Sequence, residues 1–378
     1  MKTHRKILIV LHDLHEVLEG IANYNQMDQW LLRIIDHQHD IHKAIKSWQP
    51  DGVIYHHTIW KKAPRLSVPM VEVLNPNPEK NSFSIDIDNK ECGRLAAEFF
   101  LDKGFLDLAF ITGAMRDRSI QQFTGLNNTA EARDRNLLWF EHKCEQGMVP
   151  SHQLQTNTLR LGKWLKQQPR PLGVLTINDY HALHVLEACR QMDLRVPEDI
   201  SVLGTGNDPH LCAIAHPSLS SIRFSYRQIG FEAARLLDAR LKNRTPVRQH
   251  FRIAPIEIIE RNSTNAMAIN DPAVLKALIF INEHCGEPTR VSEVVRHSGV
   301  SRSLLQFKFQ RVLQRSPLEE IHRQKMEAAK KLLRTTTLTM EEIAGHCGLT
   351  DQAQFTKLFK KMTSVTPSAF RREFSIFQ

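Results

Sequence analysis

The stretch VSEVVRHSGVSRSLLQFKFQRVL covers residues 291–313 and decides the fold of the C-terminal part of the chain. Its apolar spacing predicts a short amphipathic helix, a turn at Gly299 and a second helix capped by Ser301. A helix that follows a turn so closely is placed as the recognition helix of a helix-turn-helix unit. Its apolar face is expected to be core and holds Leu304, Leu305, Phe309 and Val312. The opposite face carries the candidate DNA-contacting residues Arg302, Ser303, Gln306 and Arg311.

Residues 338–362, LTMEEIAGHCGLTDQAQFTKLFKKM, repeat this pattern. Thr339 is the expected N-cap, and Glu342, three residues later, is its capping-box partner. A turn at Gly348 leads into a helix that begins near Asp351. The apolar face of that helix holds Phe355, Leu358 and Phe359. Its exposed face carries the second set of candidate DNA-contacting residues, which are Gln352, Gln354, Lys357, Lys360 and Lys361.

One long helix, predicted over residues 317–335, joins the two units and would hold their recognition helices at a fixed separation. Arg and Gln side chains can form paired hydrogen bonds with guanine and adenine edges, and Lys suits phosphate. The whole chain carries a net charge of +9, and residues 271–378 hold 17 basic against 11 acidic residues, so most of the excess lies in this part. Two joined units with a basic excess indicate double-stranded DNA as a partner.

The first 260 residues have a different texture. Short runs rich in Val, Ile and Leu alternate with amphipathic stretches such as 89–105 and 179–194. Continuous apolar strands that alternate with helices predict an α/β fold with parallel sheets covered on both faces. The predicted strands are KILIVL (6–11), DGVIYH (51–56), VPMVEVL (68–74), FSIDID (83–88), DLAFITG (107–113), PLGVLTI (171–177) and ISVLGTG (200–206).

Polar side chains follow several of these strands. Ligands of parallel sheets bind beyond the carboxyl ends of the strands, so these side chains are candidate ligand contacts. Each could instead be a helix N-cap or a turn former, since Asp and Asn are favoured there, and the sequence leaves this open. The residues that follow strands are His12, Asp13, His15, His56, His57, Arg116, Asp117, Arg118, Asn178, Asp179, Asn207 and Asp208.

Composition excludes several classes of protein. With 42% hydrophobic and 24% charged residues, wholesale disorder is excluded. The six cysteines show no CxxC spacing, so neither a disulfide framework nor a zinc ribbon is indicated, and a reducing cytoplasm is expected. No apolar run reaches the roughly 18 residues of a membrane-spanning helix. The polar stretch 262–272 predicts a linker that ends in an N-cap at Asp271 followed by Pro272.

Several motifs of the C-terminal part recur in a known order: SRSLL and Phe309 within 301–309, Ser316-Pro317, Ala329, Leu332-Leu333, EEIA (341–344), Gly348-Leu349, Phe355-x-Lys357-x-Phe359, Thr366-Pro367 and Arg371. With these motifs, residues 271–372 resemble the AraC-type DNA-binding domain. The resemblance implies that both recognition helices enter successive major-groove segments on one side of the duplex. Phe307 stands where that family often has a basic residue. Gln314 and Ser364 replace the glycines that usually follow each recognition helix.

The first 260 residues resemble the effector domain of LacI/GalR-type regulators, which is related to periplasmic sugar-binding proteins. The motifs that carry this resemblance are Asp51-Gly52-Val53-Ile54, DIDN (86–89), Asn178-Asp179, VPEDISVLG (196–204) and Glu260-Arg261-Asn262-Ser263. They imply a two-lobed, periplasmic-binding-protein-like α/β domain with parallel sheets, followed by the all-α domain with two helix-turn-helix units. The expected boundaries are about 1–104 and 221–243 for lobe one, about 105–220 and 244–262 for lobe two, 263–271 for the linker and 272–378 for the DNA-binding domain. The usual N-terminal DNA-binding segment of LacI-type regulators is not expected, because a strand begins at Lys6.

The combined resemblance implies a sequence-specific transcription regulator with a small sugar effector between the lobes, and a pentose such as xylose is favoured. Arg133 matches the family's cleft arginine, whose fork of donors clasps sugar hydroxyls. Asn178 and Asp179 match the pair after a lobe-two strand. Gly206 falls where a ligand-binding Asp is usual and Asn136 replaces a common glycine, so the sugar could differ or Asp208 could substitute. A homodimer without cofactor or metal is expected.

Two alternatives remain at this point. A carbohydrate-active enzyme would need catalytic groups, but we find no HExxH, G-x-S-x-G, P-loop or Rossmann glycine pattern, and Cys144 and Cys189 lack a neighbouring base. The cluster His37, His39 and His42 is interpreted as an exposed loop and helix start. A metal sensor could use four histidines that follow the first and second predicted strands, which are His12, His15, His56 and His57.

Overall fold

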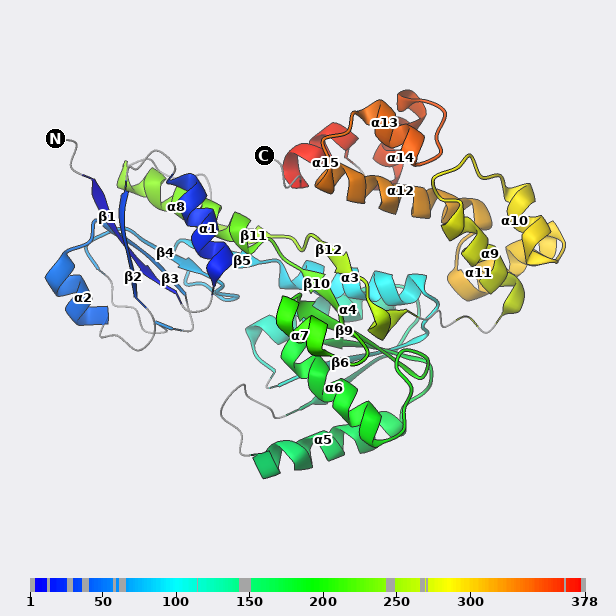
Figure 1. Cartoon of the computed structure of the whole chain (residues 1–378), viewed down its shortest axis with the longest axis horizontal. Coiled ribbons are helices and arrows are strands. Elements are labelled where there is room, and N and C mark those ends of the chain that lie inside the picture. The colour runs from blue at the N-terminus through cyan, green and yellow to red at the C-terminus, as the bar shows by residue number, and fades with distance from the viewer. Residues whose placement is uncertain are drawn as a thin grey trace. The chain divides into compact units, whose positions relative to one another are not determined.

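The computed structural model describes residues 4–11, 14–25, 30–35, 41–56, 59–60, 66–113, 115–142, 151–242, 249–265, 269, 271–363 and 365–374 (Figure 1). These residues form two compact units. The first contains residues 1–98 and 107–265, and the second contains residues 99–106 and 266–378. The short segment 99–106 therefore groups with the C-terminal helices, although in sequence it lies between the two segments of unit 1.

The first sheet of unit 1 is fully parallel and forms lobe one. Its strand order is β11-β5-β4-β3-β1-β2. The strands are β1 (Arg5–Val10), β2 (Trp30–Ile35), β3 (Gly52–His56), β4 (Met70–Val73), β5 (Ser84–Ile87) and β11 (His250–Ile253). The helices are α1 (His15–Tyr24), α2 (Ile41–Trp48) and α8 (Tyr226–Leu241). Helices α1 and α8 pack backbone to backbone, because a Cβ on Gly20 would lie 1.9 Å from the Arg227 carbonyl oxygen.

The second sheet forms lobe two, with the order β12-β10-β9-β8-β6-β7. Its strands pair in parallel except β12, which is antiparallel to β10. The strands are β6 (Asp107–Thr112), β7 (Leu137–Glu141), β8 (Leu172–Thr176), β9 (Ile200–Gly206), β10 (Ser220–Arg223) and β12 (Glu257–Ile259). The helices are α3 (Asn89–Asp102), α4 (Asp117–Glu131), α5 (Ser151–Lys166), α6 (Asp179–Gln191), α7 (Pro209–Ile214) and the 3-10 turn η1 (Asn262–Thr264).

The lobe boundaries differ from the expected ones. The chain passes between the sheets three times, after β5, after β10 and after β11. Strand β11 pairs with β5 in lobe one, whereas residues 244–262 were expected in lobe two. Helix α3 packs closely on α4 of lobe two, since a Cβ on Gly93 would lie 2.0 Å from the Gln122 carbonyl oxygen. The linker also begins later than predicted, because Ser263 is fully buried and its hydroxyl donates to the Val202 carbonyl.

Every secondary-structure element in the described part of unit 2 is a helix, which confirms the predicted all-α C-terminal domain. Its elements are α9 (Pro272–Glu283), α10 (Val291–Ser298), α11 (Arg302–Leu313), α12 (Pro317–Thr335), α13 (Met340–His346), α14 (Gln352–Thr363) and α15 (Pro367–Phe374). One core packs around Phe309 and includes residues of α9, α10 and α11. A second core packs around Phe355 and Phe359. Helix α12 contributes to both cores and therefore connects the two helix-turn-helix units.

The predicted caps of unit 2 are confirmed. Asp271 accepts hydrogen bonds from the backbone N–H groups of α9, with Pro272 at the first helical position. Ser301 caps α11, and Thr339 forms a capping box with Glu342. Gln314 follows α11 with a φ of 56°, so it adopts the left-handed conformation without being glycine. Ser364 lies outside the described residues.

Candidate functional site

A buried carboxylate lies at the carboxyl end of β5. Asp86 is only 3% exposed, and its Oδ1 has no hydrogen-bond partner within the described residues. Its Oδ2 accepts a long hydrogen bond of 3.4 Å from Asn89 Nδ2 at the start of α3. Asp88 next to it caps α3, since its Oδ1 accepts from the Glu91 N–H at 3.0 Å. Because Asp88 is used as a helix cap, Asp86 is the carboxylate available to a ligand.

Lobe two contributes polar groups from α4, which begins just beyond the carboxyl end of β6. Gln122 is 1% exposed, its Nε2 donates to Asn89 Oδ1 at 3.4 Å, and its Oε1 has no partner within the described residues. The neighbouring Gln121 donates to the carbonyl of Pro76 in lobe one at 2.8 Å. Arg118, one turn earlier on α4, interacts electrostatically with Asp86. Groups from both lobes therefore meet here.

The electrostatics of this cluster favour neutral partners that donate hydrogen bonds. Burial raises the pKa of Asp86 to about 6, while the positive charges of Arg118 and Arg252 act in the opposite direction. Burial also raises the pKa of Tyr226, at the start of α8, to about 12. Asp86 Oδ1 and Gln122 Oε1 are buried acceptors without a donor within the described residues. A ligand that donates hydrogen bonds to them would remove the free-energy cost of burying unpaired polar atoms. A ligand with several hydroxyl groups supplies such donors together with acceptors for Arg118.

The structure brings together the four predicted residues that follow β8 and β9. Asp179 is 3% exposed; its Oδ1 accepts from Ser221 Oγ at 2.5 Å and its Oδ2 from the Asp208 N–H at 2.8 Å. Asn178 and Asp208 are the N-caps of α6 and α7. The Asn207 side chain accepts from Arg261 at 2.9 Å. The bonds of Asn178 and Asp208 thus fit the alternative in which these residues are helix caps. Burial raises the pKa of Asp179.

Asp179 also explains why Gly206 departs from the expected aspartate. Gly206 has a φ of 125°, where side chains are strained, and a Cβ on it would lie 3.3 Å from Asp179 Oδ2. A Cβ on Gly204 would lie 2.2 Å from Asp179 Oδ1. The buried carboxylate fills the space that a side chain on β9 would need.

Arg133 is not at this site. It lies in the turn between the end of α4 and the start of β7, so it is at the amino edge of the lobe-two sheet. The polar residues after β6, β8 and β9 lie at the opposite, carboxyl edge. The motif match placed the arginine at the wrong end of α4, and Arg118 at the other end is the arginine that interacts with Asp86.

The lobe-one candidates are placed only in part. His15 is the exposed first residue of α1, and His56 is the half-buried last residue of β3. His12, Asp13 and His57 lie outside the described residues. Within the part that is described, no three His, Cys, Asp or Glu side chains gather as metal ligands would.

The sequence did not select Asp86, Asn89 or Gln122 as site residues. Asp86 and Asn89 were used only as members of the DIDN motif that carries the family resemblance, and Gln122 has no distinctive spacing. Two signals were available, namely the DIDN motif that ends β5 and the charged RDR run (116–118) that follows β6. The carboxyl-edge rule applied to both runs would have paired Asp86 with Arg118.

The candidate DNA-contacting residues all lie on the exposed faces of α11 and α14. They are Arg302, Ser303, Gln306, Arg311, Gln352, Gln354, Lys357 and Lys360. Gln354 Oε1 accepts from the Thr350 N–H at 3.1 Å and from its hydroxyl at 2.9 Å, so only its amide N–H groups remain for another partner. Leu304, expected in the core, is instead 42% exposed.

A buried lysine holds the two helix-turn-helix units of unit 2 together. Lys325 of α12 is 4% exposed, and its Nζ donates to the carbonyls of Glu287 at 2.7 Å and Gly348 at 2.8 Å. Glu287 precedes the first unit, and Gly348 forms the turn of the second. Burial lowers the pKa of this lysine. The separation of the recognition helices therefore depends on this junction as well as on α12.

Two α/β lobes followed by two helix-turn-helix units define a transcription regulator that responds to a small ligand. Residues 97–264 match the periplasmic binding protein-like domain family, and residues 294–373 match a helix-turn-helix domain family. The chain thus has the architecture of the xylose operon regulator type, in which a LacI/GalR-like, periplasmic-binding-protein-like sensor is joined to a C-terminal AraC-type DNA-binding domain.

The similarity to individual proteins extends over nearly the whole chain. The xylose operon regulatory protein of Escherichia coli (strain K12) is 29% identical over 370 residues, which cover 94% of this chain and 93% of the relative. The protein of the same name from Haemophilus influenzae (strain ATCC 51907 / DSM 11121 / KW20 / Rd) is 28% identical over 371 residues, which cover 94% of this chain and 94% of the relative. The solved structure of the xylose-binding transcription activator xylR matches with a TM-score of 0.62 and 26% identity, covering 99% of this chain and 100% of that one. Among the described helices, none is long and apolar enough to span a membrane.

Proposed function

We propose that this regulator binds a pentose such as xylose between its two lobes and that the sugar changes its affinity for DNA. The observation that carries the proposal is the pair of buried acceptors, Asp86 Oδ1 and Gln122 Oε1, which come from different lobes. A sugar that donates hydroxyls to both atoms favours one arrangement of the lobes. The whole-length similarity to xylose operon regulatory proteins supports a pentose.

On the DNA side, the exposed residues of α11 and α14 are proposed to contact base edges and phosphates. Arg302, Gln306 and Gln352 suit base edges, whereas Lys357 and Lys360 suit phosphates. A homodimer would double the contacted site. We further propose a cytoplasmic location, where operator DNA and sugar meet, and no turnover of the bound sugar, since the relatives are regulators.

Thermal unfolding with a panel of sugars tests the effector assignment. A pentose present at 100 times its Kd should stabilise unit 1 by about 2.7 kcal/mol, because a ligand that binds only the folded state shifts unfolding by mass action. Selection from random or genomic fragments then identifies the operator, whose affinity is measured with and without that sugar. Lack of any shift across pentoses, hexoses and disaccharides would contradict a sugar effector, and absence of sequence-dependent binding would contradict the regulator's DNA role.

Phe307 is expected to contact a thymine methyl group in the operator. It lies on the outer face of α11 between Ser303 and Gln310 and is 61% exposed, so no core packing explains it. Apolar side chains in the major groove recognise the 5-methyl group of thymine. Replacing the contacted thymine by uracil should weaken wild-type binding about 4-fold, the effect of burying about one methyl group. The same replacement should leave the operator affinity of Phe307→Ala unchanged.

Leu304→Ala is the matched control for this experiment. Leu304 is also an exposed apolar residue of α11 but lies three residues earlier. Its variant should keep the full uracil effect. If uracil at every operator thymine is neutral for the wild type, Phe307 has no such contact.

A further inference from the structure

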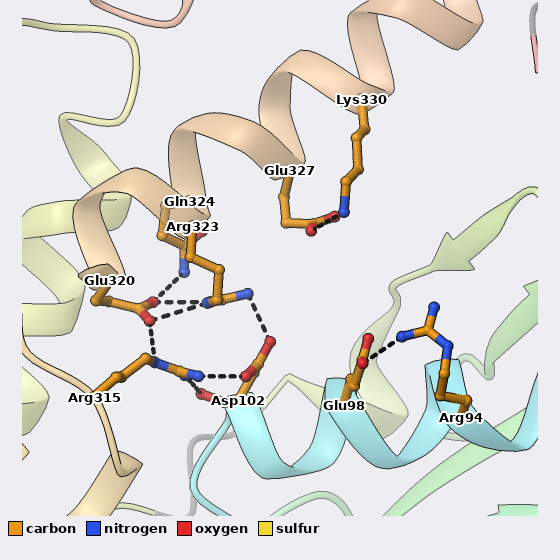
Figure 2. Close-up of polar contacts among 9 residues, drawn as sticks. All are labelled: Arg94, Glu98, Asp102, Arg315, Glu320, Arg323, Gln324, Glu327 and Lys330. Atoms are coloured by element: carbon orange, nitrogen blue, oxygen red, sulfur yellow. Dashed lines mark hydrogen bonds and ion pairs between the residues drawn. The ribbon is translucent and has the colours of Figure 1, made fainter. Parts of the chain in front are cut away.

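A balanced cluster of two acids and two arginines surrounds the end of helix α3 (Figure 2). Asp102, the last residue of α3, accepts from Arg315 Nη1 at 2.6 Å through Oδ1 and from Arg323 Nη1 at 2.8 Å through Oδ2. Glu320 pairs with Arg315 Nε at 2.6 Å and with Arg323 Nη2 at 2.8 Å. Gln324 adds a hydrogen bond to Glu320 at 2.9 Å. Asp102 is thus one half of the negative charge that the two arginines require.

The cluster is shielded from water, which makes it sensitive to the loss of one member. Glu320 is fully buried, and the Arg315 and Asp102 side chains are 12% and 17% exposed. The other ion pairs of the same helices in Figure 2 are more open, with Glu98 38% and Glu327 52% exposed. A buried pair depends on geometry and on both partners far more than an exposed pair does.

The arginines of the cluster lie beside the first recognition helix. Arg315 follows α11 by two residues, directly after the left-handed Gln314. Arg323 and Glu320 belong to the first two turns of α12, the helix that connects both helix-turn-helix units. A change in the position of Asp102 therefore acts first on the junction between α11 and α12.

The opposite end of α3 lies in the proposed sugar site. Its first residue, Asn89, bonds to Asp86 and Gln122. The helix has 14 residues and contains no proline, and its first half packs closely against α4 at Gly93. At about 1.5 Å per residue it spans roughly 20 Å. One continuous helix thus begins at the ligand-contacting groups and ends in a charge cluster of the DNA-binding unit.

We propose that Asp102 is the positioning residue through which α3 couples sugar binding to the orientation of the first recognition helix. This inference rests on the proposed function for its ligand and goes beyond it in naming the route. The bound sugar changes the hydrogen bonds of Asn89 at the start of α3. Helix α3 then moves as one rigid element. Because Asp102 is ion-paired with Arg315 and Arg323, these two arginines move with the end of the helix. By linkage, DNA binding acts back on the start of α3 to the same extent.

Asp102→Asn in the full-length protein tests the route. In the wild type, saturating xylose should change operator affinity by a factor in the ordinary allosteric range of about 5- to 150-fold. In Asp102→Asn, saturating xylose should change operator affinity by less than about 2-fold, because the coupling is lost. The Kd of this variant for xylose should equal that of the wild type. Arg323→Lys keeps the charge but loses the planar fork, so it should fold normally and give an intermediate factor.

Glu98→Gln is the matched control, because it removes the same charge from the same helix one turn earlier. It should leave the factor unchanged. Amide hydrogen exchange of residues 89–98 provides a readout that needs no sugar: operator DNA should alter it in the wild type and in Glu98→Gln but not in Asp102→Asn. If exchange responds equally in all three proteins, the route through Asp102 is wrong. If xylose has no effect on the wild type while exchange still responds, the effector assignment is wrong and the route stands.

Discussion

Gly348→Ala is expected to lower the free energy of unfolding of unit 2 by about 3 kcal/mol. Gly348 has a φ of 61°, which costs about 1 kcal/mol for a residue with a side chain. A Cβ there would lie 2.2 Å from the Glu287 carbonyl oxygen, and such overpacking costs about 1–3 kcal/mol more. The same carbonyl accepts from Lys325, so relief of the clash must disturb the junction of the two helix-turn-helix units. Thermal unfolding and operator affinity measure the two consequences.

Gly345→Ala provides the control within the same helix-turn-helix unit. Gly345 lies in α13 with an ordinary φ, and a Cβ on it would meet nothing within 4 Å. This variant should be neutral or stabilising by up to about 1 kcal/mol, because alanine is the better helix former. Equal destabilisation by both substitutions would show that the close approach at Glu287 is not what requires glycine.

Most of the central strands were predicted from the sequence, and the edge strands were not. All seven predicted strands are present, and the described residues contain five more that were missed, which are β2, β7, β10, β11 and β12. Four of these are the outermost strands of the two sheets. The edge strands β11 (HFRI) and β12 (EII) are short and include polar residues, so they lack the continuous apolar run that marks a strand covered on both faces. The edge strands β2 (WLLRII) and β7 (LLWFE) do have apolar runs, and these were overlooked. β10 is internal but begins Ser220-Ser221, because those hydroxyls bond to Thr264 and Asp179.

The helices and caps of the DNA-binding domain were more predictable than the residues of the ligand site. Caps, turns and the apolar spacing of amphipathic helices are local, so Ser301, Thr339 and Gly299 were assigned from their neighbours in sequence. The ligand site combines β5, α3 and α4, and its contacts depend on which end of each element faces the other lobe. Arg133 was misplaced for this reason, since a motif match gives a residue type and not the edge of the sheet.

Asp86→Asn is expected to weaken pentose binding about 100-fold while the ligand-free protein becomes more stable. The substitution replaces a buried charged acceptor by an amide, and hydrogen bonds to charged groups are worth about 1.5–3 kcal/mol. At pH 7 the folded state bears the cost of keeping a buried carboxylate ionised, and an asparagine of the same shape does not. Calorimetric titration gives the Kd, and thermal unfolding gives the stability.

The pH dependence separates Asp86 from other buried groups. Its pKa in the folded state, about 6, lies above the ordinary value of 3.8, so the folded state binds the extra proton. This contribution to stability is present below about pH 4 and is lost as the pH rises to about 6. Burial lowers the pKa of His142 to about 3 and of His181 to about 4, which gives the opposite slope in the same window. The difference between wild type and Asp86→Asn therefore isolates the carboxylate.

Asp208→Asn distinguishes the site built around Asp86 from the one expected at the end of β9. Asn caps helices as well as Asp does, so α7 should be retained, and Asp208 is exposed. If the sugar lies against Asp86 and Gln122, Asp208→Asn should bind pentose with nearly the wild-type Kd. A large loss with Asp208→Asn and none with Asp86→Asn would place the ligand at the rim of lobe two. The ionised form of Asp86 is the better acceptor for hydroxyl groups, so wild-type affinity should also rise between pH 5 and 7, and that rise should be absent from Asp86→Asn.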